Sequence, residues 1–270
     1  MLNKQETIRE LKICSKELGY SIKRRDCSKS LYFSCVNNFG SFNKAKENAG
    51  LEIKNKRLKR IDKSIFNKDA KLSQIASYIT FDGHLYKDSK AFYYSSKNIS
   101  DLNEFEKLIK NKLKISGKYY LNNGGATNVK THKYIVFSKL ISEGLIDLGI
   151  PKGDKTNRDF EVPPWVKKSR SLSKEYLKIA FFCEGSFKDD SRKNPRISIG
   201  ISKTEEHLNS GINFMNSLKE MLEKFNIQTT KCYITGNRIR KKDGLTSRDI
   251  RFRILTQDNH KFINKIGWIK

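Results

Sequence analysis

Two segments of the sequence end an apolar helix with a carboxylate followed by glycine. The first spans residues 75–83 and carries Asp82, and the second spans 177–185 and carries Glu184. Taken alone, each ending is a common helix-stop turn, but the acids lie 184 − 82 = 102 residues apart and precede the same series of elements. Paired carboxylates repel one another unless divalent cations neutralise them. The repetition therefore favours a paired site.

The elements expected after each acid also repeat. The expected first series is strands within 84–96, a helix at 102–113, strands at 118–121 and 133–139, and a helix at 145–148. The expected second series is strands at 186–188 and 196–202, a helix at 212–225, strands at 231–240 and 248–255, and a helix at 262–266. Small residues on the two apolar helices, Ala76, Ser77, Ala180 and Cys183, predict that these helices cross closely. The order helix, two strands, helix, two strands, helix thus occurs twice.

The charge balance points to an acidic partner. The chain has 55 Lys and Arg against 29 Asp and Glu, a net charge of +26, which favours binding to a polyanion. Its 16 Phe and 11 Tyr argue against a disordered basic tail. The longest apolar run, residues 179–183, is far shorter than the roughly 20 residues of a membrane span, and the N-terminus is unlike a signal peptide. Five scattered cysteines argue against a disulfide framework and favour a reducing compartment.

The helix, acid and glycine segments resemble the motif of the LAGLIDADG homing endonuclease family. Residues 75–83 match its apolar and small positions except at Thr80, whereas the second copy has Lys178 and Ile179 at usual small positions. The resemblance implies an α+β fold of two pseudo-twofold αββαββα halves that form a DNA-binding saddle, preceded by a small helical N-terminal module. It also implies that Asp82 and Glu184 are catalytic acids and bind Mg²⁺, or alternatively Mn²⁺, together with Gly83 and Gly185.

The same resemblance places the strands in the DNA major groove. Residues at steps of two along a strand share one face, and Lys, Arg, His and Asp side chains offer donors and acceptors to base edges. The expected DNA contacts are His84, Tyr86, Asp88 and Lys90, then Ser186, Lys188, Asp190 and Arg192, and finally Arg238, Arg240, Lys241, Lys242, Arg248 and Arg251. The alternative for any one of them is an ordinary exposed strand residue.

Two basic residues are expected beside the scissile phosphates, because members of this family place cations there. Lys139 and Arg253 are the candidates, since each falls late in the last strand expected for its half. Lys133, Lys203 and Arg251 lie close by in the sequence and stay open as alternatives.

The first 55 residues form a separate helical pattern. Ile8, Leu11 and Leu18 have helical spacing, and the segment 39–51 resembles the short helical repeat attached to homing endonucleases. This resemblance implies a helix-turn-helix-like accessory module that contacts DNA through Lys23, Arg24, Arg25 and Lys44. A helical cap packed on the main domain is the alternative.

The expected domain plan has five parts: an accessory module at 1–55, a basic linker at 56–66, a first half at 67–161, a linker at 162–168 and a second half at 169–270. The expected function is site-specific double-strand DNA cleavage at a long asymmetric target by a monomer that needs no protein partner or membrane. An intron RNA maturase and a non-cleaving transcription regulator remain alternatives. The ends of the chain lack intein splicing residues, so we expect a freestanding or intron-encoded mobile element in a prokaryotic cytoplasm or an organelle matrix.

Overall fold

The computed structural model describes residues 2–53, 62–122, 130–188 and 196–267. The chain forms two compact units, Met1–Ile61 and Asp62–Lys270. Part of the expected basic linker, residues 56–61, lies outside the described residues, and so do Asp190 and Arg192 of the expected DNA contacts. No helix in the described part of the chain is long and apolar enough to cross a membrane.

The N-terminal unit is built from three short helices. They are α1 (Lys4–Glu17), α2 (Lys29–Phe39) and α3 (Phe42–Asn48), with a 3-10 turn η1 (Arg24–Asp26) after α1. The side chains of Asn3, Ser28 and Ser41 cap the helix N-termini by accepting backbone N–H groups. The helices enclose a small core of Leu11, Ile22, Leu31, Cys35, Ala45 and Ala49.

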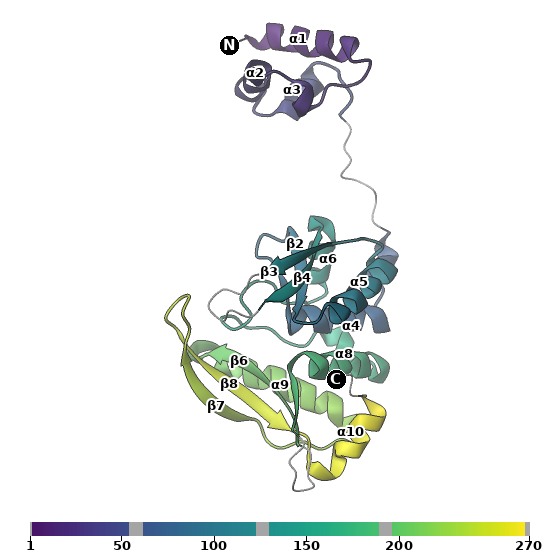
Figure 1. Ribbon diagram of the computed structural model, residues 1–270, viewed down its shortest axis with the longest axis vertical. Helices are drawn as coiled ribbons and strands as arrows, with labels where there is room; N and C mark the ends of the chain where they lie inside the picture. Colours follow the sequence, from purple (N-terminus) through teal and green to yellow (C-terminus); the bar gives the residue numbers. More distant parts are fainter. Residues whose placement is uncertain (1, 54–61, 123–129, 189–195, 268–270) are drawn as a thin grey trace. The chain divides into compact units, whose positions relative to one another are not determined.

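The second unit contains the same series of elements twice (Figure 1). The first half holds α4 (Ala70–Thr80), β1 (Gly83–Leu85), β2 (Ala91–Ser96), α5 (Ile99–Leu113), β3 (Lys118–Asn122), β4 (Thr131–Phe137) and α6 (Lys139–Asp147). The second half holds α8 (Arg170–Glu184), β5 (Gly185–Lys188), β6 (Arg196–Thr204), α9 (Leu208–Glu223), β7 (Tyr233–Ile239), β8 (Thr246–Arg253) and α10 (Asn259–Lys265). Short helices η2 (Lys63–Phe66), α7 (Pro164–Lys168), η3 (Glu205–His207) and η4 (Thr256–Asp258) complete the unit. The duplicated α+β order is confirmed.

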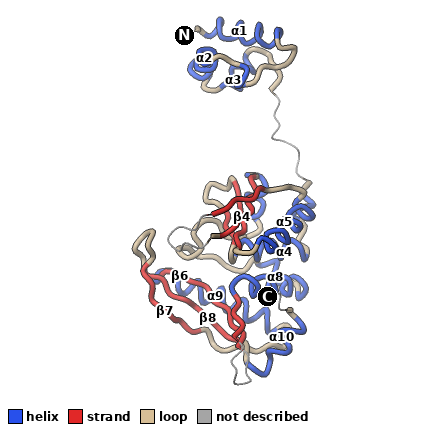
Figure 2. The backbone as a smooth tube through the Cα atoms, viewed as in Figure 1, coloured by secondary structure: helices blue, strands red, loops and turns tan. Residues whose placement is uncertain are grey.

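Each half has one four-stranded antiparallel sheet, and the two sheets share one strand order, β1-β2-β4-β3 and β5-β6-β8-β7. Figure 2 shows the strands in red and the helices in blue. Helix α5 packs on β2 and β4, and α9 packs on β6 and β8. Alternate side chains point away from these helices. We call these surfaces the first outer face, with His84, Tyr93, Tyr120, Lys133, Ile135 and Phe137, and the second outer face, with Ser202, Tyr233, Arg238, Asp249, Arg251 and Arg253.

Helices α4 and α8 join the two halves, side by side. Small buried residues line their contact, including Ala76 and Ala180, so the backbones approach closely. Ser73 Oγ donates to the Leu172 carbonyl at 2.7 Å, and Ser77 Oγ donates to the Tyr176 carbonyl at 2.8 Å. Hydroxyl groups thus reach the backbone of the facing helix directly. The predicted close crossing places the C-terminal ends of both helices together.

The glycine after each acid is required by close packing at the joint between helix and sheet. A Cβ on Gly83 would lie 2.6 Å from the Tyr93 carbonyl oxygen and 2.7 Å from Ile79 Cα, and a Cβ on Gly185 would clash with the Phe181 carbonyl. Neither glycine has a positive φ. The backbone conformation therefore does not require glycine at either position, and steric exclusion of a side chain is the reason for it.

We expect Gly83→Ala and Gly185→Ala each to lower the free energy of unfolding by about 1–3 kcal/mol, because the added methyl group meets backbone atoms that cannot rotate away. Thermal unfolding followed by circular dichroism measures this effect. Ser186→Ala, one position further along β5, is the control and should melt like the wild type. An unchanged melting midpoint in both glycine variants would contradict the packing argument.

Candidate active site and nucleic-acid interface

The two acids predicted from the sequence lie at adjacent helix ends. Asp82 follows the end of α4 by two residues and is half-buried, whereas Glu184 is the last residue of α8 and is exposed. Both carboxylates act electrostatically on the same two groups, Lys155 and the Cys183 thiol. Burial, followed by the charge of Asp82, raises the pKa of Cys183 well above its usual value. This thiol therefore stays protonated and serves as a packing group.

Lys155 is the residue at this site that the sequence analysis missed. It comes from the loop between α6 and α7, and its Nζ donates to the carbonyl oxygens of Ile79, Thr80, Phe81 and Gly83 at 2.6–2.9 Å. These oxygens include the unpaired carbonyls at the end of α4, where the helix dipole favours a cation. Burial lowers the pKa of Lys155 to about 8, although Asp82 and Glu184 favour the charged form.

A second lysine forms hydrogen bonds with the main chain of this loop. Lys203 on β6 is fully buried, and its Nζ donates to the carbonyls of Lys155 (2.9 Å) and Arg158 while lying over the Phe160 ring. Asp154 in the same loop accepts Nζ of Lys242 at 2.6 Å and the guanidinium of Arg240. Gly153 N–H of this loop also donates to the Leu85 carbonyl of β1 at 2.7 Å. The loop between the halves is therefore fixed to both sheets, and this fixes the position of the Lys155 ammonium group.

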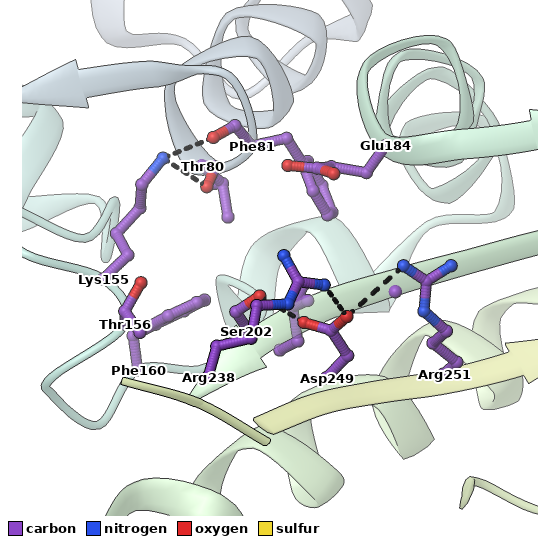
Figure 3. Close-up of a pocket in the computed structure, with 12 residues that line it drawn as sticks. Thr80, Phe81, Lys155, Thr156, Phe160, Glu184, Ser202, Arg238, Asp249 and Arg251 are labelled. Carbon is purple, nitrogen blue, oxygen red and sulfur yellow. Dashed lines mark hydrogen bonds and ion pairs between the residues drawn. The ribbon is translucent and has the colours of Figure 1, made fainter. Parts of the chain in front are cut away.

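A cavity of about 320 Å³ opens beside Glu184 and Lys155 (Figure 3). The second outer face forms its floor, where Asp249 accepts from Arg238 and from Ser202 Oγ (2.6 Å) and lies 3.6 Å from Arg251. Glu184 enters the cavity from the end of α8, opposite these arginines. The cavity thus combines one carboxylate donor for a metal ion with cations that can contact a nucleic acid.

Asp82 lines a different cavity, of about 740 Å³, with Ser95, Lys97, Asp101 and Cys183. The main-chain oxygen of Asp82 accepts Ser95 Oγ at 3.2 Å. This cavity has no arginine among its described lining residues, so the surroundings of the two acids differ in charge.

The donor atoms fit a hard divalent cation that shares its shell with substrate. No group of three or more His, Cys, Asp or Glu side chains able to hold a metal occurs in the described residues. Mg²⁺ commonly keeps several waters and takes only one or two carboxylates plus substrate phosphates, so Asp82 and Glu184 suffice. The oxygen of Gly83 accepts the Lys155 ammonium at 2.8 Å, which disfavours a metal cation there and corrects the expectation for Gly83.

Several expected DNA contacts lie where the sequence analysis placed them. His84, Ser186, Lys188, Arg238 and Arg251 are on strands and on the outer faces. Arg253, which was expected beside the scissile phosphates, ends β8 on the second outer face. His84 stacks on Tyr93 with ring centroids 5.5 Å apart, and Tyr86 packs on both rings from the following turn. Arg253 Nε donates to the Tyr233 hydroxyl at 3.0 Å.

The structure places other expected DNA-contact residues away from the outer faces of the sheets. Strand β1 ends at Leu85, so Asp88 and Lys90 lie in a turn, where they form an exposed ion pair of 2.8 Å. Arg248 points to the helix side of its sheet and bonds Glu205 at 3.0 Å.

The remaining corrections concern Arg240 and Lys139, which were expected on strands and lie instead in the β7–β8 turn and at the start of α6. Arg240 is nearly buried between Asp154 and Asp243, beside Lys242 and the exposed Lys241. Lys139 begins α6 and pairs with Glu143, so it is not in the last strand of its half.

The four cations expected in the N-terminal unit are near its surface. Lys23 Nζ lies over Tyr20 at 4.8 Å and the Arg24 guanidinium over Tyr32 at 4.5 Å. Arg25 pairs with Asp26 at 3.6 Å, and Lys44 is exposed near the start of α3. Their contact with nucleic acid stays a prediction.

Comparison with solved structures identifies the fold. The homing endonuclease I-WcaI bound to its DNA recognition sequence aligns with 83% of this chain and 93% of its own, at a TM-score of 0.51 and 15% identity. The homing endonuclease I-DmoI (TM-score 0.48, 14% identity, 74% of this chain and 97% of its own) and the N-terminal LAGLIDADG domain of WhiA (0.47, 16%, 81% and 93%) are also similar. The chain therefore has a LAGLIDADG-like α+β fold of two halves, as predicted.

Sequence comparison finds short matches inside longer proteins. The chain is 26% identical over 216 residues to the tRNA-splicing ligase RtcB of Methanopyrus kandleri, covering 73% of this chain and 20% of the ligase. It is 28% identical over 144 residues to the RNA polymerase subunit Rpo1N of Methanocaldococcus jannaschii, covering 52% and 10%. The chain thus spans a fifth or less of the length of these relatives. No family model matches it.

Proposed function

We propose that this protein is a site-specific DNA endonuclease that hydrolyses both strands of a duplex with the help of Mg²⁺ or Mn²⁺. The observation that carries the proposal is the placement of two acids, Asp82 and Glu184, at the C-terminal ends of the packed helices α4 and α8, in a unit with two sheets of identical strand order. A regulator that only binds DNA needs the sheets but has no need of these two acids. The DNA-bound state of I-WcaI supports the same assignment for this fold.

Each group has a separate task in this proposal. Asp82 and Glu184 would hold the divalent cation, which when bound polarises the scissile phosphates and offsets charge in the transition state. Lys155 fixes the end of α4 and supplies positive charge beside both acids. Arg238, Arg251 and Arg253 bind the DNA from the second outer face, and His84 with its aromatic neighbours does so from the first.

The sequence relatives support the interpretation that this chain is a module whose function is independent of the longer proteins in which similar segments occur. The chain is similar to segments of proteins named as a tRNA-splicing ligase and an RNA polymerase subunit, which catalyse different reactions. A segment that is similar in both enzymes does not explain either of their different activities, whereas a mobile element can reside in either. We therefore propose a mobile genetic element, intron-encoded or freestanding, that acts as a monomer.

The test is cleavage of a plasmid library that carries randomised or candidate junction sites, with Mg²⁺ or Mn²⁺ and with a chelator as control. Discrete double-strand cuts that need the metal support the proposal. Duplex binding without cutting under either metal would replace it with a DNA-binding regulator. Preferential binding of intron RNA without duplex binding would replace it with a maturase.

We expect duplex affinity to depend steeply on salt, because a chain with a net charge of +26 releases counterions from DNA when it binds. Affinity should fall roughly 10³- to 10⁵-fold between about 50 and 200 mM salt if about 6–10 phosphates are contacted. Fluorescence anisotropy with a labelled duplex measures the slope. Lys188→Ala on the exposed end of β5 should reduce the slope by about one, whereas Lys139→Ala on α6 should leave it unchanged. A flat response would show that phosphate contacts do not drive binding.

A further inference from the structure

The two outer faces differ in chemistry although their strand order is the same. The sequence has no arginine between Arg60 and Arg158, so the whole first sheet lacks this residue. The strands of the second sheet contain five arginines, namely Arg196, Arg238, Arg248, Arg251 and Arg253. A duplex lying across both sheets would therefore meet unlike surfaces at its two half-sites.

The first outer face presents rings and aliphatic carbon. The register pairs Tyr93 with Ile135, and Tyr120 and Phe137 lie with ring centroids 6.3 Å apart. Tyr120 is 42% exposed and Phe137 is 57% exposed. The cations on the described part of this face are two lysines: Lys133, whose Nζ lies 4.8 Å from the Tyr93 ring centroid, and the exposed Lys118, which pairs with Ile135 in the register. An exposed apolar surface on a strand without a covering helix is suited to contact apolar groups of a partner.

The second outer face presents guanidinium groups held in defined positions. Asp249 holds Arg238 and lies 3.6 Å from Arg251, and the Tyr233 ring and hydroxyl hold Arg253. The side chain of Arg251 crosses over Gly200, where a Cβ would lie 2.6 Å from Arg251 Cγ. The side chains of Arg238 and Arg251 remain 68% and 40% exposed. These arginines are therefore preorganised and still accessible.

In the major groove, arginine forks pair with the O6 and N7 acceptors of guanine, whereas apolar side chains pack against the thymine methyl group. We propose that the DNA target is asymmetric in base composition: guanines mark the half-site under the second sheet, and thymines, read through their methyl groups, mark the half-site under the first sheet. This inference rests on the proposed DNA function and specifies the substrate of the same site.

Selection of bound duplexes from a randomised library gives the first measurement. We expect the recovered sites to have one guanine-rich and one thymine-rich half. Arg251→Lys should relax the preference for guanine by roughly 5- to 150-fold at one position, which assigns that half to the second sheet. Arg248→Lys is the matched control, because Arg248 faces the helices and bonds Glu205.

Replacement of thymine by uracil in the selected site gives the second measurement, since it removes only the methyl group. Binding should weaken about two- to fivefold for each contacted thymine in the first half-site and stay unchanged in the second. Phe137→Ala and Tyr120→Ala should abolish this sensitivity. Leu140→Ala, at an apolar residue of similar exposure on α6, should retain it.

The outcomes separate this inference from the function on which it rests. A discrete duplex site whose halves have equal composition, or whose binding ignores uracil, would overturn the inference and leave the endonuclease intact. Recovery of no duplex site would overturn both. Sites with the expected asymmetry, together with uracil sensitivity that disappears in the ring variants, would establish the inference.

Discussion

Asp82→Asn and Glu184→Gln should each lower the rate of double-strand cleavage by at least about a hundredfold, the scale of losing one preorganised electrostatic contact at an active site. Each substitution keeps the size of the side chain and removes the charge that attracts a divalent cation. Binding to duplex in the presence of a chelator should become tighter, because the wild-type carboxylates repel DNA phosphates when no metal neutralises them. Activity and affinity thus change in opposite directions.

The measurement is cleavage of a selected site with each strand labelled separately, combined with fluorescence anisotropy in chelator. Glu143→Gln is the matched control, since Glu143 is an acid on α6 that forms an ion pair with the exposed Lys139 at 3.5 Å. It should cut and bind like the wild type. Normal cleavage by the Asp82 and Glu184 variants would show that the acids have no part in the mechanism. Weaker binding of duplex DNA by these variants in the presence of chelator would indicate that the acids support the fold instead.

The sequence predicts the order of elements in the second unit because hydrophobic periodicity is local. The apolar spacing in α4 and α8 and the caps at Asp69 and Ser169 are visible without knowledge of the fold. The duplication then follows from comparison of the two halves. The pairing of the acids could be inferred because both occupy the same place in a repeated unit.

Side-chain direction at strand ends could not be predicted in the same way. A bulge between Thr235 and Arg238 shifts the alternation in β7, and the strand ends at Ile239. Arg240 therefore turns toward Asp154, which belongs to the loop between α6 and α7 and lies 86 residues away in the sequence. The predicted strand positions of Lys139 and Asp88 were wrong for a related reason, since β4 ends two residues before Lys139 and β1 ends three residues before Asp88. Strand alternation fixes a face only while the strand continues.

The position of Lys155 depends entirely on tertiary structure. Nothing in its neighbourhood in the sequence separates it from the many other lysines of this basic chain. Its role follows from the path of the loop, which Gly153 N–H anchors to the Leu85 carbonyl at 2.7 Å and Thr204 N–H anchors to the Thr156 carbonyl at 3.0 Å. A cation that completes a helix end from a distant loop is visible only in the folded protein.

Lys155→Met should reduce cleavage about 10²- to 10³-fold and lower the free energy of unfolding by about 3 kcal/mol. The variant leaves three carbonyl oxygens at the end of α4 and that of Gly83 on β1 without their ammonium donor, and it removes positive charge beside both acids. Cleavage kinetics and chemical denaturation measure the two effects. Lys152→Met, three residues away on the edge of a different cavity, is the control and should change neither.

The pH dependence distinguishes a charge role from a packing role for Lys155. Its pKa is lowered to about 8 by burial, so the ammonium is lost as pH rises above 8 and cleavage should fall about tenfold per pH unit. The unfolded chain keeps this proton up to about pH 10.4. Between these two values the unfolded state binds more protons, so stability relative to Lys155→Met should rise with pH.

Cleavage and relative stability should therefore change in opposite directions between about pH 8 and 10. Lys203, whose pKa is also lowered to about 8, and the buried thiols titrate in both proteins. Their contribution therefore cancels in the difference in free energy of unfolding between wild type and Lys155→Met. If Lys155 acted only by holding the helix end, cleavage would follow stability through this range. A fall in cleavage while the stability difference grows requires the charge of the ammonium group itself, and ties the loop between the halves to the reaction at Asp82 and Glu184.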